Sequence, residues 1–388
     1  MRRHDAIARQ LKTKQLAKQP SCAYPVTQHT RHAYGCPGRQ AQIERVFFAW
    51  SFVSMKPFSK PAIDIPAQLA LLKQRGLTIQ DESKAYCFLE AVSFFRLTPY
   101  MRPFQLSDDV EHGFRVGTQL WGLTRLYEFD RRLRLLVIDA VERIEIATRA
   151  AISNHMGPKY GAHWYLDAGL FQREYRHQVL LESIQAKQEK ARKDHERECK
   201  RIEASQTSDA RKTQLKNKRA KESYARHYAL TYDTPALMPA WAVMEEITLG
   251  ELSHLFKGLA RDADKKAIAR RIALPGPLLQ SWLHTLTTIR NICAHHARLW
   301  NRELGIRPEL PKTVSFLWPQ HLQRPGQHTR IFTVLCILNL LMRKVSPHTN
   351  WDGRLHELLG EFLEVDLAAM GFPTDWQSDP FWKIPADK

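Results

Sequence analysis

Apolar residues recur at spacings of three and four along most of the chain, and this period is that of amphipathic helices. The longest such stretch runs from Trp121 to Met156, where Gly157-Pro158 is expected to end the helix. Shorter stretches with the same period predict helices after Ile65-Pro66, after Asp81, over Trp241–Leu259, over Ile331–Val345 and over Trp351–Leu367. The sequence therefore predicts an all-α fold.

Another helix is predicted to begin after Pro275-Gly276-Pro277 and to continue as far as Arg302. When this helix is drawn at about 100° per residue, one side of it is polar and mostly cationic. The residues on this side are Arg290, Asn291, His295, Arg298 and Arg302. The opposite side carries tryptophans and leucines and also His296. We therefore expect His295 to face solvent and His296 to pack in the core.

An arginine, an asparagine and a histidine on one exposed side of a helix suit a phosphodiester group. A planar guanidinium group matches the oxygens of a phosphate, and an imidazole transfers protons near neutral pH. The amide of Asn291 is able to orient either group. The pattern thus favours phosphate chemistry at Arg290, Asn291 and His295, with Arg298 and Arg302 positioning the substrate. The alternative is a basic helix face that is simply solvated.

Two further arginines are candidates for contact with RNA. Arg96 lies in the segment FFRLTPYMRPF, where arginines alternate with aromatic residues that are able to stack on single-stranded bases. Alternatively, those aromatic residues belong to the core and the arginines pair with carboxylates. Arg149 and His155 match a looser Arg-x5-His spacing, but they lie about 120° apart on a helix and Glu145 is placed to pair with Arg149. His155 is then expected to cap the helix end near Gly157.

The segment from Arg290 to His295 resembles the Arg-x4-6-His motif of the HEPN ribonuclease superfamily, in which a polar residue often follows the arginine. The longer string RNICAHHARLWNR resembles the signature of the Abi-like abortive infection family, the AbiD/AbiF group of bacterial phage-defence proteins. Three other segments resemble blocks of that family in the same order: Lys60-Pro61 with IPAQLALLKQRGL and FFRLTPYMRPF, then WAVMEEITLGELSHLF, and last MGFPTDWQSDPFW. Together the resemblance covers roughly residues 56–383.

The resemblance implies a HEPN-like helical bundle and an endoribonuclease whose catalytic residues are Arg290, Asn291 and His295. RNA carries its own nucleophile, so attack by a 2′-hydroxyl leaves a 2′,3′-cyclic phosphate without a metal ion. One imidazole cannot easily make both proton transfers, and a homodimer would supply a second His295, as HEPN sites typically do. The resemblance also implies an RNA or protein inhibitor, because an unchecked nuclease kills its host. The alternative is a non-catalytic RNA-binding module of a phage-defence or toxin–antitoxin system.

The chain carries a formal net charge of +18 and has an isoelectric point near 9.7, which points toward a polyanionic partner. Most of this charge lies in two segments, since residues 1–54 carry +7 and residues 182–226 carry +6. The second segment is either a helical hairpin that follows RNA phosphates or a solvated charged helix pair broken near Ser205–Asp209. The charge alone would also fit a DNA-binding regulator, which binds duplex DNA and is indifferent to a 2′-hydroxyl.

Several classes of function find no support in the residues. The six cysteines form no Cys-x-x-Cys pair and the 17 histidines show no zinc-binding spacing, so we expect reduced thiols and no metal. A glycine-rich phosphate loop and a Rossmann fingerprint are both missing, so we expect no nucleotide cofactor. The longest apolar runs, Val46–Val53 and Ile331–Met342, fall short of the roughly 20 residues of a membrane span, so we expect no membrane association and a cytoplasmic location.

The expected organisation has three parts. Residues 1–54 form a basic extension without sustained periodicity, which we expect to be disordered, and Met55 is the expected natural start of the protein. Residues 55–120 form a short helical N-terminal region. Residues 121–383 form the HEPN-like helical domain, into which residues 182–230 are inserted as a charged helical segment.

Overall fold

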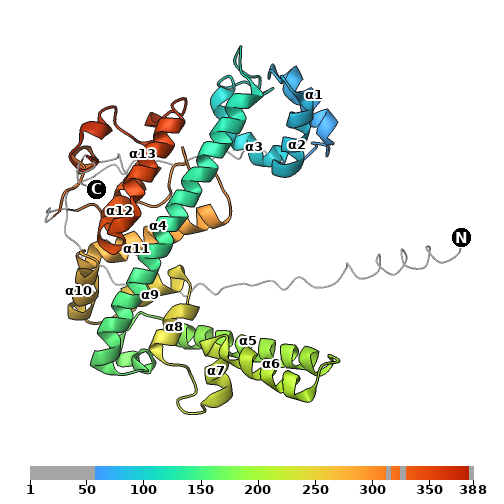
Figure 1. Cartoon of the computed structure of the whole chain (residues 1–388). Helices are drawn as coiled ribbons and strands as arrows, with labels where there is room; N and C mark the ends of the chain where they lie inside the picture. The colour runs from blue at the N-terminus through green and yellow to red at the C-terminus, as the bar shows by residue number, and fades with distance from the viewer. Residues whose placement is uncertain (1–56, 312–315, 324–328, 384–388) are drawn as a thin grey trace, which may run out of the picture. The chain divides into compact units, whose positions relative to one another are not determined.

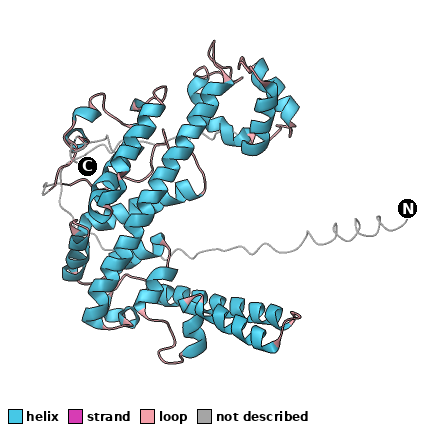
Figure 2. Cartoon of the chain, viewed as in Figure 1, coloured by secondary structure: helices cyan, strands magenta, loops and turns pink. Residues whose placement is uncertain are grey.

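The computed structural model describes residues 57–311, 316–323 and 329–383. The described chain from Ala62 onward forms one compact unit. The basic extension expected over residues 1–54, with the start expected at Met55, lies outside the described residues. Within the described ranges the chain forms thirteen α-helices, short 3-10 turns and no strand (Figure 2). The prediction of an all-α fold is confirmed.

The longest helix, α4 (Leu120–Tyr160), has 41 residues and is the element on which most other helices pack (Figure 1). The helices that contact it from the second half of the chain are α8 (Ala240–Glu246), α9 (Leu249–Gly258), α10 (Asp262–Arg271), α11 (Gly276–Ala294), α12 (Ile331–Val345) and α13 (Trp351–Glu361). Residues of α4 such as Phe129, Leu133 and Val137 are fully buried, at the three-to-four spacing seen in the sequence. This periodicity therefore predicted the central helix correctly.

The expected end of this helix at Gly157-Pro158 is wrong, because α4 continues to Tyr160. A proline inside a helix leaves the carbonyl four residues earlier without its partner. Here that carbonyl belongs to Asn154, and it accepts a hydrogen bond of 3.2 Å from the guanidinium group of Arg271. The helix ends instead at Gly161, whose φ of 92° suits a residue without a side chain.

The main hydrophobic core surrounds α4, and α12 is its most buried helix, with Phe332, Leu335 and Leu338 almost fully enclosed. The apolar run of this segment is thus a core helix. Among the described residues, no single helix combines the length and the apolar character of a membrane span. The pair Ile331–Val345 and Pro347–Glu361 meets these criteria together, but it bends by 111° at the junction. The helix expected over Trp351–Leu367 ends earlier, at Glu361.

Three short helices precede α4 and enclose a second, smaller core. They are α1 (Ile65–Gln74), α2 (Glu82–Val92) and α3 (Phe94–Met101). Leu72 and Leu97 are buried in this core together with Leu123 from the first turn of α4. The side chains of Asp64 and Asp81 accept backbone N–H groups at the starts of α1 and α2, as N-cap residues do. Helices and a small core of their own therefore occupy the chain before α4.

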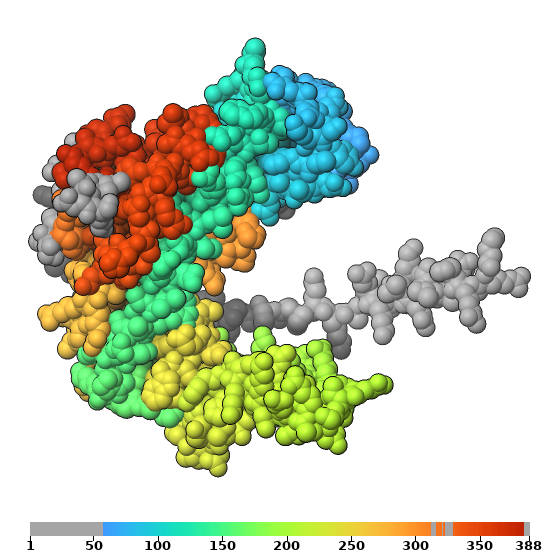
Figure 3. Space-filling model, in the orientation of Figure 1, coloured from blue at the N-terminus to red at the C-terminus, as the bar shows by residue number. Residues whose placement is uncertain are grey.

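The charged segment forms a helical hairpin of α5 (His177–Glu203) and α6 (Asp209–Lys221), followed by α7 (Tyr224–Thr231). The two helices of the hairpin lie side by side (Figure 1), and Figure 3 shows the surface of this segment in yellow-green. The break between them falls where the sequence predicted it, near Ser205–Asp209. None of the residues of α6 is buried, in agreement with its lack of apolar periodicity.

One predicted helix is divided in two. The stretch Trp241–Leu259 forms α8 and α9, with the break at Ile247 and Thr248. The hydroxyl group of Thr248 accepts the N–H of Glu251, and the Glu251 carboxylate accepts the N–H of Thr248. This capping box satisfies the first N–H groups of α9 and explains why a new helix begins there.

Candidate functional site

The helix that carries the motif, α11, ends at Ala294. The prediction that it continues to Arg302 is wrong. His296 adopts a left-handed conformation with φ of 55° and donates its N–H to the carbonyl of Cys293, while Ala297 donates to the carbonyl of Ile292. These two hydrogen bonds form a Schellman motif, which closes a helix and turns the chain away from its axis.

Both histidines of the motif are exposed. The expectation that His296 packs in the core is wrong, because the chain leaves the helix before this residue. Leu299 and Trp300 take the buried places instead, with 0% and 3% of their surface exposed. The expectation that His295 faces solvent is confirmed.

Arg290, Asn291 and His295 remain together at the end of α11. Asn291 and Arg290 lie in the last turns of the helix, and His295 is the C-cap residue. The backbone N–H of His295 donates a hydrogen bond of 3.0 Å to the carbonyl of Asn291. The Asn291 side-chain oxygen accepts a hydrogen bond of 3.1 Å from the Arg290 guanidinium group. Neither Arg290 nor His295 forms an ion pair with any carboxylate in the described ranges. Their polar atoms are thus available to a ligand.

A buried carboxylate fixes the segment that follows the motif, and sequence reasoning missed it. Asp130 of α4 is fully buried and accepts the backbone N–H of Leu299 at 3.1 Å and that of Trp300 at 2.7 Å. The hydroxyl group of Tyr100 and the guanidinium group of Arg134 also donate to this carboxylate. Asp130 therefore ties α3, α4 and the segment after α11 together.

Burial raises the pKa of Asp130, while the neighbouring Arg134 and the hydrogen bonds from Tyr100, Trp300 and Leu299 favour its charged form. Burial also raises the pKa of the Tyr100 hydroxyl, and the charge of Asp130 adds to this effect. The phenol therefore stays protonated and remains a donor. A signal was present in the sequence, because an Asp and an Arg four residues apart stand within the apolar stripe of α4.

Arg96 contacts the turn that follows the motif helix, where it binds a backbone carbonyl. Its guanidinium group donates a hydrogen bond of 2.8 Å to the carbonyl of His296, and that of Arg134 lies 3.4 Å from the carbonyl of Ala297. Arg298 in turn donates to the carbonyl of Pro99 at 3.4 Å. The turn after α11 is thus held by α3 and α4 through arginine contacts to backbone oxygens.

Arg149 is not brought to the motif residues by any contact that it makes. Its guanidinium group is half-buried, pairs with Glu145 as the sequence predicted, and donates to the carbonyls of Met244 and Ile247 at the end of α8. Hydrogen-bond donors at the C-terminus of a helix satisfy the last carbonyl groups, which have no partner within the helix. Arg149 therefore joins α4 to the end of α8.

His155, the histidine of the second motif match, lies against α10. Its Nε2 is 2.8 Å from the carboxylate of Asp264, which also accepts hydrogen bonds from Lys159 at 2.5 Å and from Tyr160 at 2.7 Å. This cluster joins the last turns of α4 to the first turn of α10. His155 therefore pairs with a carboxylate, and the expectation that it caps the helix end is wrong.

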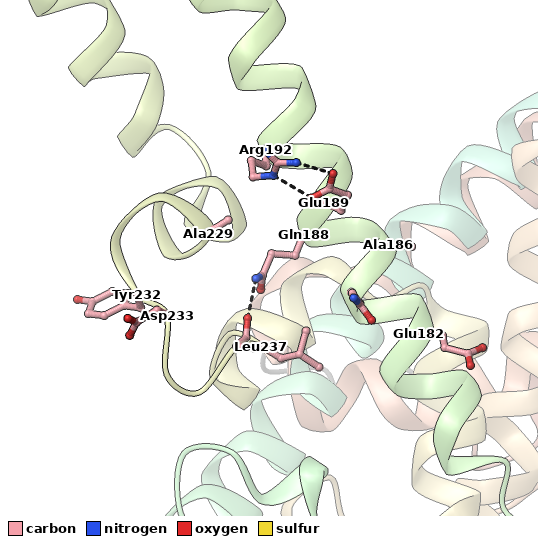
Figure 4. Close-up of a pocket in the computed structure, with 11 residues that line it drawn as sticks. Glu182, Ala186, Gln188, Glu189, Arg192, Ala229, Tyr232, Asp233 and Leu237 are labelled. Carbon is pink, nitrogen blue, oxygen red and sulfur yellow. Dashed lines mark hydrogen bonds and ion pairs between the residues drawn. The ribbon is translucent and has the colours of Figure 1, made fainter.

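The charged hairpin neutralises much of its own charge. A cavity of about 770 Å³ lies between α5 and α7, and Arg192 at its edge is paired with Glu189 at 2.7 Å (Figure 4). The third guanidinium nitrogen of Arg192, Nη1, pairs with Glu196. Elsewhere on the hairpin, Lys216 pairs with Glu203. None of the residues that line this cavity belongs to the motif.

In the described part of the chain, no group of three or more His, Cys, Asp or Glu side chains is arranged to hold a metal ion. A family model described as Abi-like protein matches residues 87–301, which is more than half of the chain. The matched range begins within α2 and includes Asp130 and the whole of α11. Comparisons with curated proteins and with solved structures gave no significant match.

Proposed function

The chain belongs to the Abi-like protein family, and on this premise we propose that it is an endoribonuclease of a bacterial abortive infection system that acts against phage. We place it in the HEPN superfamily and in the AbiD/AbiF group. The observation that carries the proposal is the grouping of Arg290, Asn291 and His295 at the exposed end of α11. These groups suit a phosphodiester and form no ion pair within the described residues.

The reaction that fits these groups needs no metal ion. His295 takes the proton from a ribose 2′-hydroxyl, whose oxygen attacks the adjacent phosphorus. The bond from phosphorus to the 5′ oxygen of the next nucleotide breaks, and that oxygen leaves with a proton from a second imidazole. The products are a 2′,3′-cyclic phosphate and a 5′-hydroxyl. Arg290 stabilises the charge on the phosphorane oxygens, and Asn291 holds the Arg290 guanidinium group in place.

The second imidazole comes from a second copy of the chain, so the active form is a homodimer with two copies of His295. The exposure of His295 supports this arrangement, because a buried histidine cannot face a partner subunit. We further propose that the protein acts in the cytoplasm and that an RNA or a protein inhibits it in uninfected cells.

The test uses purified wild-type protein and the His295→Ala variant with labelled RNA in the presence of EDTA, followed by analysis of the RNA ends. We expect wild type to leave cyclic phosphates and His295→Ala to leave the RNA intact. His284→Ala is a matched control, since His284 is also exposed and lies on the same helix. Products with 3′-hydroxyl ends, or cleavage that persists in His295→Ala, would contradict the mechanism.

The alternative is a non-catalytic RNA-binding module, which the same arginines, half-buried at 290 and 298 and exposed at 302, would serve. The two functions differ in cells. A nuclease is toxic on expression and loses its toxicity with His295→Ala, whereas a binding module shows no cleavage in either form.

A further inference from the structure

A cavity of about 980 Å³ lies beside the segment that follows the motif. It is lined by the connection between α3 and α4, by the first turns of α4, by residues after α11 and by residues after α13. The lining residues that matter here are Arg102, Arg115, Trp121, Arg298, Trp300 and Asn301. None of the residues of the cavity takes part in the proposed chemical step.

The positive charges of this cavity lack carboxylate partners. Arg102, Arg115 and Arg298 form no ion pair within the part of the chain that the structure describes, and neither does the nearby Arg302. Burial lowers the pKa of Arg298, and the charges of Arg102 and Arg302 lower it further, while Asp130 opposes them. Arg102 and Arg302 therefore lie close enough to Arg298 to repel it, and a bound anion would offset this repulsion.

Two carboxylates also line the cavity. Glu364 pairs with Arg125 at 2.8 Å, whereas Asp366 accepts the backbone N–H of Ala368 at 2.9 Å and keeps its negative charge. The three lining arginines therefore outnumber the one lining carboxylate that has no cation partner among the described residues.

An aromatic ring stands at the same cavity. Trp121 is 61% exposed, which is unusual for the largest apolar side chain, and it occupies the first turn of α4. The guanidinium carbon of Arg125 lies 5.6 Å from its ring centroid and 3.9 Å from that of Phe362. Arg125 thus links Trp121 to the surface of the fold, so the ring is held in place and yet accessible for stacking.

The cavity also lies near the proposed site of cleavage. Arg298 follows His295 by three residues, so their Cα atoms are separated by no more than about 11 Å. Two hydrogen bonds fix the position of Arg298. The backbone N–H of its neighbour Leu299 binds the carboxylate of Asp130, and its own guanidinium group binds the carbonyl of Pro99.

We propose that this cavity binds a nucleotide of single-stranded RNA next to the cleaved phosphodiester, with a phosphate on Arg102 and Arg298 and a base stacked on Trp121. A cationic groove with an exposed aromatic ring is the usual arrangement for single-stranded nucleic acid. The placement of this nucleotide next to a cleaved phosphodiester rests on the proposed function. The binding of RNA by the cavity is independent of the proposed function.

The test measures the dissociation constant of a fluorescently labelled single-stranded RNA of about twelve nucleotides by anisotropy, with the full chain carrying His295→Ala so that the probe survives. We expect Trp121→Ala and Arg102→Ala each to weaken binding about tenfold, and Trp121→Phe to restore most of the affinity. Arg102→Ala should also lower the slope of log Kd against log salt by about 0.7, the loss of one phosphate contact. Unchanged affinity in both variants would overturn the proposal.

Two matched controls separate this cavity from general effects. Trp241→Ala removes another exposed tryptophan, 51% exposed on α8, and Arg270→Ala removes an exposed arginine of α10. Both should bind the probe within about twofold of the parent. Since Trp121 and Arg102 are exposed, the midpoints of urea unfolding of their alanine variants should equal that of the parent protein. Equal losses in the controls, or a greater loss for duplex DNA than for RNA, would refute a site for single-stranded RNA.

The outcomes distinguish this inference from the proposed function. If wild type cleaves RNA but Trp121→Ala and Arg102→Ala alter neither Kd nor kcat/KM, the cavity inference fails and the nuclease assignment stands. If wild type leaves RNA intact while both variants bind it about tenfold more weakly, the cavity binds RNA and the nuclease assignment fails.

Discussion

The carboxylate of Asp130 accepts a hydrogen bond of 2.7 Å from the backbone N–H of Trp300, a residue 170 positions later in the chain. This contact lies in the core, and it fixes the backbone directly after Arg298. The geometry at the exposed end of α11 therefore depends on a residue that has no contact with solvent.

Replacement of Asp130 by asparagine should reduce both stability and RNA cleavage. The variant keeps the shape of the side chain, but it leaves Arg134 buried without a counter-charge and turns one acceptor into a donor. The free energy of unfolding should fall by about 3 kcal/mol in urea denaturation. Asp139→Asn on the same helix is the control, since Asp139 pairs with arginines at the surface and its loss should cost about 1 kcal/mol or less. Equal losses of stability in the two variants would show that the buried hydrogen bonds of Asp130 stabilise the fold no more than a surface ion pair does.

His296→Gly should stabilise the protein by about 1 kcal/mol. The left-handed conformation of His296, with φ of 55°, is strained for a residue with a side chain and unstrained for glycine. Urea denaturation of wild type and variant measures the change. His295→Gly is the matched control, because φ of His295 is −86° and glycine there should destabilise. A loss of stability in His296→Gly would mean that the imidazole makes a favourable contact which outweighs the strain.

Acid should weaken the link between α4 and α10. Burial alone would raise the pKa of Asp264, but the hydrogen bonds from Lys159, His155 and Tyr160 outweigh it and lower the pKa to about 2. Because the folded pKa lies below the model-compound value of 3.8, this stabilisation is complete above pH 4 and is lost as the pH falls toward 2. The stability difference between wild type and Asp264→Asn, measured by urea denaturation, should shrink by about 2 kcal/mol over that range. A constant difference would show that the carboxylate is not stabilised by these donors.

Arg149→Ala should lower stability without changing the affinity for RNA. The variant leaves Glu145 unpaired and removes the donor to the carbonyls of Met244 and Ile247, at a cost of about 2 kcal/mol. Thermal unfolding and the anisotropy assay measure the two properties. Weaker RNA binding at unchanged stability would instead support the contact with RNA that the sequence suggested for Arg149.

The sequence predicted those features that depend on local periodicity. The long helix α4 and the core helix α12 follow from apolar spacings of three and four residues, and Asn291 and His295 stand four residues apart on α11 with Arg290 beside them. The end of α11 does not follow from such spacings, because no glycine or proline marks it and a histidine takes the left-handed position. Asp130 was missed for a different reason, since its partners Leu299 and Trp300 are remote in sequence and offer only backbone N–H groups.

The helix α3 contributes Arg96 to the carbonyl of His296 and Tyr100 to the carboxylate of Asp130. Two residues of one eight-residue helix thus hold the two ends of the turn that follows α11. A ligand that bound α3 and displaced it would release the carbonyl of His296 and the carboxylate of Asp130 together, and would so disturb the turn next to His295. One short helix thus couples the α4 core to the exposed end of α11, so its position sets the geometry of both.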